Sequence, residues 1–302
     1  MELYLKHRPK AFKTVVGQPD AVRVLHQMVR DERVPHALLL TGPSGCGKTT
    51  LARILVSKLD CSAGDFQEIN AADFRGIDTV REIRTRMTLS PIHGKCRIWV
   101  IDEAHKLSND AQNALLKALE DTPKHVYFIL ATTDPAKLIK TILTRCTEVK
   151  LREMAMSSLQ ELIKDIADQE KIKLSDEVTE KIIECSMGSA RYALVLLNKI
   201  VGLDESEQLD TIEKAGVQTE SIALARALLN HAPWVEVAKI LKTMPDEPES
   251  TRYLVLGYMS QVILGGGKMA PRAAEVIERF QFNFYDSKRA GLILACHSVS
   301  GR

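Results

Sequence analysis

The 302-residue sequence lacks any Cys-x-x-Cys pair, although it holds six cysteines. Cysteines scattered in this way argue against a zinc module and against a disulfide framework, so we expect reduced thiols. No apolar run approaches the length of a membrane span, and the N-terminus MELYLKHRPK has no apolar core followed by a small-residue cleavage site. These absences exclude a membrane protein and a secreted disulfide scaffold, and they predict a cytoplasmic location.

A strong charge of either sign is also missing, because the formal net charge is only +2. The two halves differ, however: residues 1–150 carry 23 Lys and Arg against 17 Asp and Glu, whereas residues 151–302 carry 18 against 22. The densest basic stretch is REIRTRMTLSPIHGKCR, which contains Arg81, Arg84, Arg86, Lys95 and Arg97. Such a stretch suits a polyanionic partner such as nucleic acid, and it is equally typical of a solvated helix face.

Internal repeats and low-complexity tracts are absent as well. A content of 45% hydrophobic and 26% charged residues is typical of a globular protein, and the length allows two or more domains. Short strand-like runs alternate with helical patterns at residues 37–42, 66–70, 97–102, 126–132 and 147–151. This alternation predicts an α/β fold with a parallel sheet that is covered by helices.

From about residue 154 onward the pattern is helical only, and Ser175 is a good helix start because Asp176 and Glu177 follow it. The stretch GLDESEQLDT is acidic and polar. Amphipathic patterns follow at residues 220–232, 233–244 and 251–264, before a helix break at the three glycines 265–267. We therefore expect three domains: a sheet domain at 1–153, a small helical domain at 154–204 and an all-helical domain at 205–302.

The strongest chemical signal is TGPSGCGKTT, which follows a predicted strand and precedes a predicted helix. It fits the phosphate-loop pattern Gly-x-x-x-x-Gly-Lys-[Ser/Thr], whose glycines let successive N–H groups point at phosphate oxygens. Lys48 is expected to reach the β- and γ-phosphates, and the Thr49 hydroxyl is expected to bind Mg²⁺. The predicted nucleotide-binding residues are Gly42, Pro43, Ser44, Gly45, Cys46, Gly47, Lys48, Thr49 and Thr50.

A phosphate loop needs one carboxylate near the metal and another near the attacking water. The apolar strand RIWVID leads into Asp102 and Glu103, at the edge where ligands bind in open parallel sheets. We expect Asp102 to support the Mg²⁺ shell and Glu103 to orient or deprotonate the water. The four letters DEAH do not by themselves indicate a helicase, and we assign His105 no catalytic role.

These paired motifs and the helical segment after the sheet resemble the AAA+ ATPases, and more narrowly the ATPase subunits of sliding-clamp loaders. The opening LYLKHRPKAFKTVVGQPDAV is similar to that family's N-terminal block. INAADFRGIDTVREI, VIDEAHKLSNDAQNALLKALED, ATTDP and ILTRC then follow in the family's order, within about the first 200 residues. The resemblance implies an AAA+ P-loop domain, a helical lid and an all-helical collar that holds subunits together.

The N-terminal block surrounds the adenine in this family, which implies nucleotide contacts from Arg8, Val16 and Gly17. His7 stands where the family usually has Tyr, and a packed N-terminal segment without such contacts is the alternative. Bacterial members also carry a cysteine-rich zinc module after the first helix, whereas this sequence passes that point with Cys61 alone. The layout is thus a minimal form, similar to the small subunits of archaeal, eukaryotic or viral loaders.

Three further catalytic roles are implied by the resemblance. Thr133 matches the first sensor, which holds the lytic water or γ-phosphate, and Arg191 matches the second sensor, a lid arginine that folds back on the nucleotide. Arg145 stands in the family's Ser-Arg-Cys motif, with Thr144 in place of Ser, and there the arginine stabilises the transition state at the neighbouring subunit's γ-phosphate. A helix cap, a solvated helix charge and an ordinary surface arginine are the respective alternatives.

The resemblance also implies contacts with DNA and with a clamp. Two segments near Arg75 and Asn109 begin helices that could offer N–H groups or side chains to phosphates. In related loaders a basic residue at the position of Arg75 restrains the catalytic Glu until DNA arrives, and a simple ion pair is the alternative. The apolar residues Met87, Leu89 and Ile92 are candidates for insertion into a clamp pocket, and they are also ordinary core candidates.

Taken together, the resemblance implies a DNA-stimulated ATPase that uses ATP and Mg²⁺ to open a sliding clamp and load it onto primer–template DNA. It implies assembly into a pentamer with copies of the same chain and at least one different subunit. The location that it implies is the cytoplasm, at the replication fork, or the cytoplasm of the host cell if the chain is viral. An AAA+ helicase motor, a helicase loader and a non-hydrolysing scaffold subunit are the alternatives. Intact Lys48, Asp102, Glu103 and Arg145 argue against a scaffold.

Overall fold

The computed structural model describes residues 2–73, 76–244 and 248–301, and within these the side chains of residues 216–219 are not described. The chain divides into two compact units, Met1–Val201 and Gly202–Arg302. The domain boundaries expected after residues 153 and 204 stay predictions. All six cysteines are free thiols, and none of the described helices combines the length and apolarity needed to cross a bilayer.

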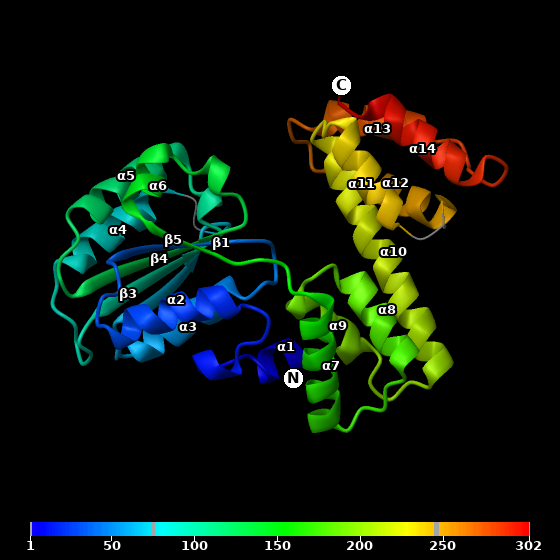
Figure 1. Cartoon of the computed structure of the whole chain (residues 1–302). Helices are drawn as coiled ribbons and strands as arrows, with labels where there is room; N and C mark the ends of the chain where they lie inside the picture. The colour runs from blue at the N-terminus through cyan, green and yellow to red at the C-terminus, as the bar shows by residue number, and fades with distance from the viewer. Residues whose placement is uncertain (1, 74–75, 245–247, 302) are drawn as a thin grey trace. The chain divides into compact units, whose positions relative to one another are not determined.

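All five predicted strands form, and they make one parallel sheet in the first unit (Figure 1). Its order is β2-β3-β4-β1-β5, so β4 lies between β1 and β3. The phosphate loop follows β1, and the acidic pair consists of the last residue of β3 and the residue after it. The end of β4 therefore lies between these two motifs. The strands are β1 (Ala37–Thr41), β2 (Phe66–Asn70), β3 (Arg97–Asp102), β4 (Val126–Thr132) and β5 (Thr147–Lys150).

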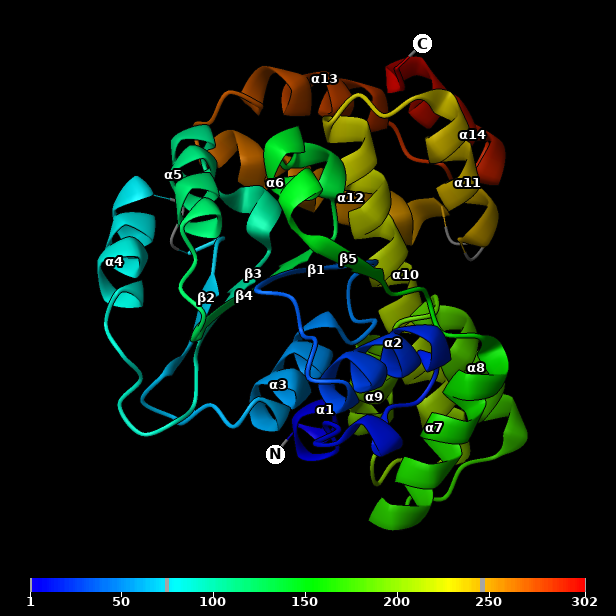
Figure 2. The same cartoon turned by 60° about the vertical axis from the view of Figure 1, so that its left-hand side comes forward.

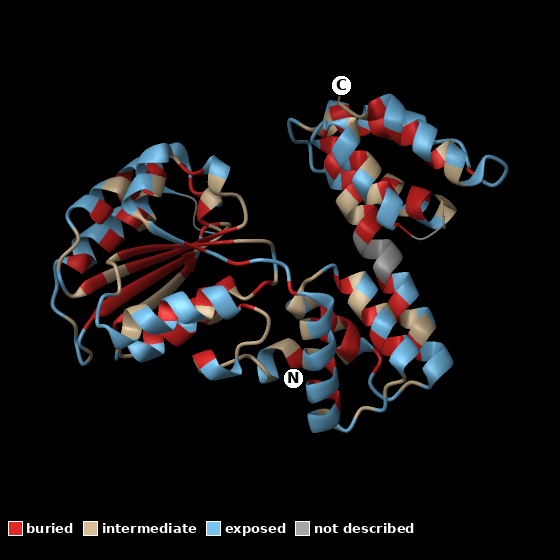
Figure 3. Ribbon diagram, in the orientation of Figure 1, coloured by how far each residue is buried: buried red, intermediate tan, exposed pale blue. Residues whose placement is uncertain are grey.

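Helices cover both faces of the sheet (Figures 1 and 2). On one face lie α2 (Pro19–Arg30) and α3 (Lys48–Lys58); on the other lie α4 (Ile77–Met87), α5 (Asn109–Glu120) and α6 (Lys140–Arg145). Because successive strand side chains point to opposite faces, Leu38 and Leu40 pack with α2 and α3, whereas Leu39 packs with the other helices. The central strands β1, β3 and β4 are therefore buried on both faces (Figure 3), whereas the edge strands β2 and β5 are only partly buried. The predicted α/β class is confirmed.

The rest of the first unit is helical. A short helix α1 (Leu3–Lys6) at the N-terminus contacts α9, and three helices follow the sheet: α7 (Met156–Glu170), α8 (Asp176–Ser186) and α9 (Ala190–Lys199). The side chains of Ser175 and Ser189 cap α8 and α9 by accepting hydrogen bonds from the backbone N–H of Val178 and Tyr192. Short 3-10 turns complete the unit at Phe12–Thr14, Ala104–Lys106 and Pro135–Lys137.

The described part of the second unit is helical throughout, and one boundary in it differs from the sequence pattern. The acidic stretch before residue 212 separates helices in the sequence, whereas in the structure it forms the first turns of α10 (Glu205–Leu229). Asp204 and Glu207 form a capping box there, and acidic side chains stabilise a helix N-terminus. The remaining helices are α11 (Trp234–Thr243), α12 (Pro248–Leu264), α13 (Ala270–Phe280) and α14 (Lys288–Val299), with the expected break at 265–267.

The three apolar candidates for a clamp contact, at the end of α4 and in the loop before β3, differ in burial. Met87 ends α4 and is only 4% exposed within the core of the sheet domain, so its proposed surface role is wrong. Leu89 and Ile92 are 58% and 61% exposed. Large apolar side chains exposed together on one loop are available to a partner protein.

This loop is held from inside by Asp65, whose carboxylate accepts the backbone N–H of Ile92 at 2.8 Å and of His93 at 3.2 Å. Arg97 donates to the same carboxylate at 3.1 Å, and both side chains are buried. Arg97 is therefore an internal residue, and its predicted place in a basic surface stretch is wrong. Burial alone would raise the pKa of Asp65, but hydrogen bonds from Ser62, the loop amides and Arg97 outweigh it and lower that pKa.

Replacing Asp65 with alanine is expected to lower the free energy of unfolding by about 3–5 kcal/mol, because the buried Arg97 charge loses its partner. Urea unfolding measures this loss. Because the pKa of Asp65 is lower in the folded state, its contribution is complete above the pKa of an unfolded aspartate, about 4, and is lost as the pH falls below it. The matched control is Asp78→Ala, which removes the exposed ion pair with Arg81 and should cost below about 1 kcal/mol. Equal losses in the two variants would contradict the expectation.

Candidate active site

The phosphate loop runs from the end of β1 into the first turn of α3. Gly42, Gly45 and Gly47 have φ angles of 148°, 76° and 107°, which L side chains rarely adopt. At Gly45 a Cβ atom would also lie only 2.1 Å from Ser189 Oγ, so the loop could not approach the capped start of α9 with any larger residue. Lys48 is buried, and its Nζ donates to the carbonyls of Gly42 at 2.7 Å and Pro43 at 2.8 Å.

The two predicted metal ligands lie side by side. The Thr49 hydroxyl donates to Asp102 Oδ2 at 2.7 Å, and the other Asp102 oxygen accepts the Glu103 backbone N–H at 2.9 Å. One hydroxyl and one carboxylate fit Mg²⁺, which usually keeps several waters and takes the remaining ligands from phosphates. In the described part of the chain, no group of three or more His, Cys, Asp or Glu side chains could hold a metal without such help.

The predicted base and the predicted sensor also meet. Thr133 Oγ1 lies 3.4 Å from Glu103 Oε2, because β4 adjoins β3 and both residues follow the ends of these strands. His105 Nδ1 lies 3.4 Å from the same Glu103 oxygen. The sequence gives no reason to assign His105 a catalytic role, and nothing in its spacing indicates this contact.

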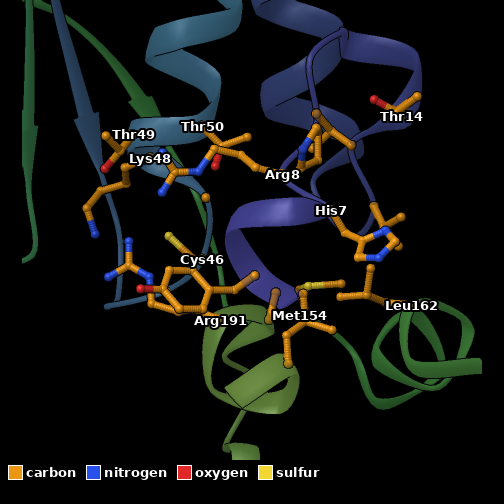
Figure 4. Close-up of a pocket in the computed structure, with 18 of the residues that line it drawn as sticks. His7, Arg8, Thr14, Cys46, Lys48, Thr49, Thr50, Met154, Leu162 and Arg191 are labelled. Carbon is orange, nitrogen blue, oxygen red and sulfur yellow. The ribbon is translucent and has the colours of Figure 1, made fainter. Parts of the chain in front are cut away.

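A cavity of about 480 Å³ opens over the phosphate loop, between the sheet edge, the N-terminal segment and the helices α7 and α9 (Figure 4). Cavities of this size hold small-molecule ligands. Of the predicted residues, those that line it are Arg8, Val16, Ser44, Gly45, Cys46, Gly47, Lys48, Thr49, Thr50, Asp102, Glu103 and Arg191. The motifs from four distant parts of the sequence thus converge on one site.

Three cations meet around this cavity and repel one another. Burial is the largest cause of a lowered pKa at Lys48, and Arg191 lowers it further, against the carboxylates of Glu103 and Asp102. Burial also lowers the pKa of Arg8, with Arg53 and Arg191 as the next causes. Partly buried cations that repel one another favour an anionic ligand, and a polyphosphate is the ligand that a phosphate loop binds.

The N-terminal block reaches the cavity, but its residues act in different ways. Gly17 does not line the cavity; its φ of 75° and the contact that a Cβ would make with Met154 explain why glycine is required. Gln18 is buried, and its amide donates to the carbonyl of Arg152 at 2.6 Å and to that of Cys46 at 3.3 Å. Gln18 therefore ties the phosphate loop to the segment that leads into α7.

Some predicted residues lie away from the cavity. Arg145 ends α6, where it donates to Glu120 Oε1 at 2.6 Å and to the carbonyl of Thr141 at 3.2 Å. Asn109 is the exposed first residue of α5, after the cap Ser108. Arg75 lies outside the described residues, so its predicted part in a DNA switch stays a prediction.

The cavity also contains residues that carry no sequence signal. Tyr4, one turn before His7, lines the cavity. Several side chains of α7 line it as well. They are Leu162, Asp165, Ile166 and Gln169. Because α7 has an ordinary amphipathic pattern, the face that meets the cavity emerges only from the tertiary structure.

Two protein-family models match overlapping parts of the sheet domain. Residues 19–90 match the Rad17 P-loop domain, and residues 63–155 match the DNA polymerase III delta subunit. Solved structures of RuvB from Thermotoga maritima have the same fold, and one variant superposes with a TM-score of 0.60 at 21% identity, covering 78% of this chain and 86% of that chain. At this identity the likeness is one of fold alone.

Curated relatives are more similar in sequence. The chain is 31% identical to the DNA polymerase III subunit gamma/tau of Mycobacterium tuberculosis, covering 93% of this chain and 50% of the relative. It is 33% identical to the DNA polymerase III subunit tau of Bacillus subtilis, with 94% and 51% covered, and to subunit gamma of Buchnera aphidicola, with 72% and 66% covered. The chain thus spans about half the length of the first curated relatives it matches. With its phosphate loop, acidic pair and helical lid, this nucleotide-binding chain belongs to the AAA+ family of clamp-loader subunits that includes DNA polymerase III gamma/tau.

Proposed function

We propose that this chain hydrolyses ATP with Mg²⁺ as one of the motor subunits of a sliding-clamp loader. The observation that carries the proposal is the contact between Thr49 and Asp102 beneath a cavity lined by Lys48, Arg8 and Arg191. A polyphosphate needs such cations, and its transfer chemistry needs a metal, a water and a group that accepts the water's proton. Family membership adds that the relatives are DNA polymerase III subunits.

In the proposed reaction, the phosphate-loop amides and Lys48 hold the β- and γ-phosphates, and Arg191 closes the cavity from α9. Lys48 must then leave the carbonyls of Gly42 and Pro43, to which it donates in the structure. Bound Mg²⁺, held through Thr49 and Asp102, would neutralise charge on the phosphate oxygens. Glu103 accepts the proton of the attacking water, and Thr133 holds the water or the γ-phosphate beside it.

Arg145 is proposed to act on the nucleotide of a neighbouring copy. It lies outside the cavity of its own chain, where it is 39% exposed and paired with Glu120. A guanidinium on the surface can reach a second subunit's phosphates and stabilise the charge that develops there. An assembly of several copies follows from this role, and the family resemblance adds at least one different subunit.

The clamp is proposed to bind the loop that Asp65 holds in place. Leu89 and Ile92 project from this loop while its backbone is fixed by hydrogen bonds to a buried carboxylate. A preformed loop loses little conformational freedom on binding, so its apolar side chains can act as anchors. DNA is proposed to contact the start of α5 near Asn109 through backbone phosphates.

The double variant Leu89→Ser, Ile92→Ser is expected to weaken clamp binding about 30-fold, since loss of a central apolar anchor typically costs about 2 kcal/mol or more. ATP turnover without clamp should stay at the wild-type rate, because neither residue lines the cavity. Clamp titration with ATP present measures both. The control Val24→Ser changes a half-exposed apolar residue on α2. If it weakened clamp binding as much, the loop would have no special role.

The proposed function as a whole is tested by ATP turnover with primer–template DNA and the cognate clamp, added singly and together. We expect the two additions together to raise turnover by more than the sum of their separate effects. The ATP turnover of a helicase motor would rise with DNA but not with a clamp. A turnover rate that the clamp does not change would therefore overturn the proposal.

A further inference from the structure

The Glu103 carboxylate contacts other side chains in addition to its proposed role as proton acceptor. It has a left-handed backbone conformation with φ of 50°, which is uncommon for a residue with a side chain, and its side chain is 34% exposed. A partly solvated carboxylate has several rotamers, so something must fix its direction if it is to meet a water in one place. Its Oε2 atom faces two side chains, with Thr133 Oγ1 and His105 Nδ1 each at 3.4 Å.

The His105 ring is itself firmly placed. Its side chain is 6% exposed, and Nδ1 lies 3.0 Å from Thr132 Oγ1. Thr132 is fully buried at the end of β4, and its hydroxyl oxygen accepts the backbone N–H of Asp134 at 3.1 Å. The ring is thus anchored to the strand that lies between the phosphate loop and the acidic pair.

The oxygens around Nδ1 decide which ring nitrogen carries the proton. An ionised carboxylate can only accept a hydrogen bond, whereas a threonine hydroxyl can donate or accept. A single proton on Nδ1 can be shared between Thr132 Oγ1 at 3.0 Å, the nearer acceptor, and Glu103 Oε2 at 3.4 Å. An unprotonated Nδ1 would turn its lone pair towards the Glu103 carboxylate. The surroundings therefore favour the Nδ1–H tautomer, whose proton lies next to both Thr132 Oγ1 and Glu103 Oε2.

Burial of the His105 ring favours its neutral form. Burial is the largest cause that lowers the pKa of His105, and Lys106 and Lys137 act in the same direction. Glu103 and Asp134 raise that pKa without reversing the shift. A neutral donor orients the Glu103 carboxylate without neutralising the charge that makes it a proton acceptor.

We propose that His105 is the positioning residue of the catalytic Glu103, whose Oε2 it holds through an Nδ1 proton that it shares between Glu103 and Thr132. With Oε2 occupied by His105 and Thr133, Oε1 is left for the attacking water. This assignment rests on the proposed ATPase function and adds a residue to its site.

Nuclear magnetic resonance on the full chain, labelled with ¹⁵N-histidine, tests the hydrogen bond without any turnover. The His105 signal is assigned through its loss in His105→Ala. The expected result is that His105 carries its proton on Nδ1 in the wild type and shifts towards the Nε2–H tautomer in Glu103→Gln. An Nε2–H tautomer in the wild type, or no change on replacing Glu103, would overturn the proposal.

Turnover of three His105 variants tests the positioning role. His105→Ala removes the donor and is expected to lower kcat up to about 100-fold, as misplacement of a reacting group does, with KM for ATP unchanged. His105→Asn places an amide where Nδ1 was and should recover most of this loss, whereas His105→Gln places it near Nε2 and should not. Equal rates in the Asn and Gln variants, or a raised KM in all three, would indicate a structural role only.

A double variant separates failure of this inference from failure of the proposed function. In the Glu103→Gln background, His105→Ala should cause no further loss, because the two residues act as a unit. If Glu103→Gln lowers turnover and His105→Ala does not, the inference is wrong and the function stands. If Glu103→Gln turns over normally, the proposed base is wrong, whatever His105 does.

Discussion

Replacing Arg145 with alanine is expected to lower ATP turnover of the assembled complex by about 10³-fold or more, while ATP affinity stays nearly unchanged. The reason is position: Arg145 lies outside the cavity of its own chain and cannot contribute to binding there. Its side chain is 39% exposed and paired with Glu120, on a helix end that another copy can approach. Loss of the charge would remove transition-state stabilisation from the neighbouring site and leave its ground-state contacts intact.

Nucleotide titration and steady-state turnover on the same preparation measure the two quantities. Arg81→Ala is the matched control, since it removes an exposed arginine of α4 that forms a surface ion pair with Asp78. The control should keep wild-type turnover in the absence of DNA. A loss of affinity as large as the loss of turnover would contradict the proposed role of Arg145.

Replacing Glu103 with glutamine is expected to lower turnover by about 10²- to 10⁴-fold, because the amide cannot accept the proton of the attacking water. The change keeps the shape of the side chain, and the phosphate loop, Lys48 and Arg191 stay in place. The variant should therefore bind ATP without hydrolysing it, and it should stay bound to the clamp. Single-turnover hydrolysis and clamp retention on gel filtration measure these effects.

The same chemical change at an exposed position, Glu82→Gln on α4, is the control for Glu103→Gln. Glu82 pairs with Arg86 on the surface and does not line the cavity. It should leave turnover unchanged. Rapid hydrolysis by the Glu103 variant would mean that another group accepts the proton.

The elements of the sheet domain were predictable because each carries its own local pattern. The five apolar runs became β1 to β5, and the phosphate-loop spacing placed Thr49 at the start of α3. The contact of Thr49 with Asp102 followed, since both motifs lie at the carboxyl edge of one parallel sheet. The strand order was not predictable, because pairing depends on contacts between distant segments.

Other features had no local signal at all. Met87 and Leu89 are both apolar and two residues apart, yet the turn after α4 buries the first and exposes the second. The charge of Arg97 suggests a surface position, whereas the side chain is buried and forms an ion pair with the buried Asp65. His105 approaches Glu103 because Glu103 adopts a left-handed turn, and a residue other than glycine gives no sequence indication of such a conformation.

Mixing two inactive variants tests whether Arg145 of one chain completes the cavity of another. Glu103→Gln keeps a working Arg145, and Arg145→Ala keeps a working Glu103, so random co-assembly should form intact sites at about a quarter of the interfaces between copies. ATP turnover of the mixture is predicted to rise clearly above that of either variant alone. A mixture that stays as inactive as its two components, although both assemble, would contradict a shared site.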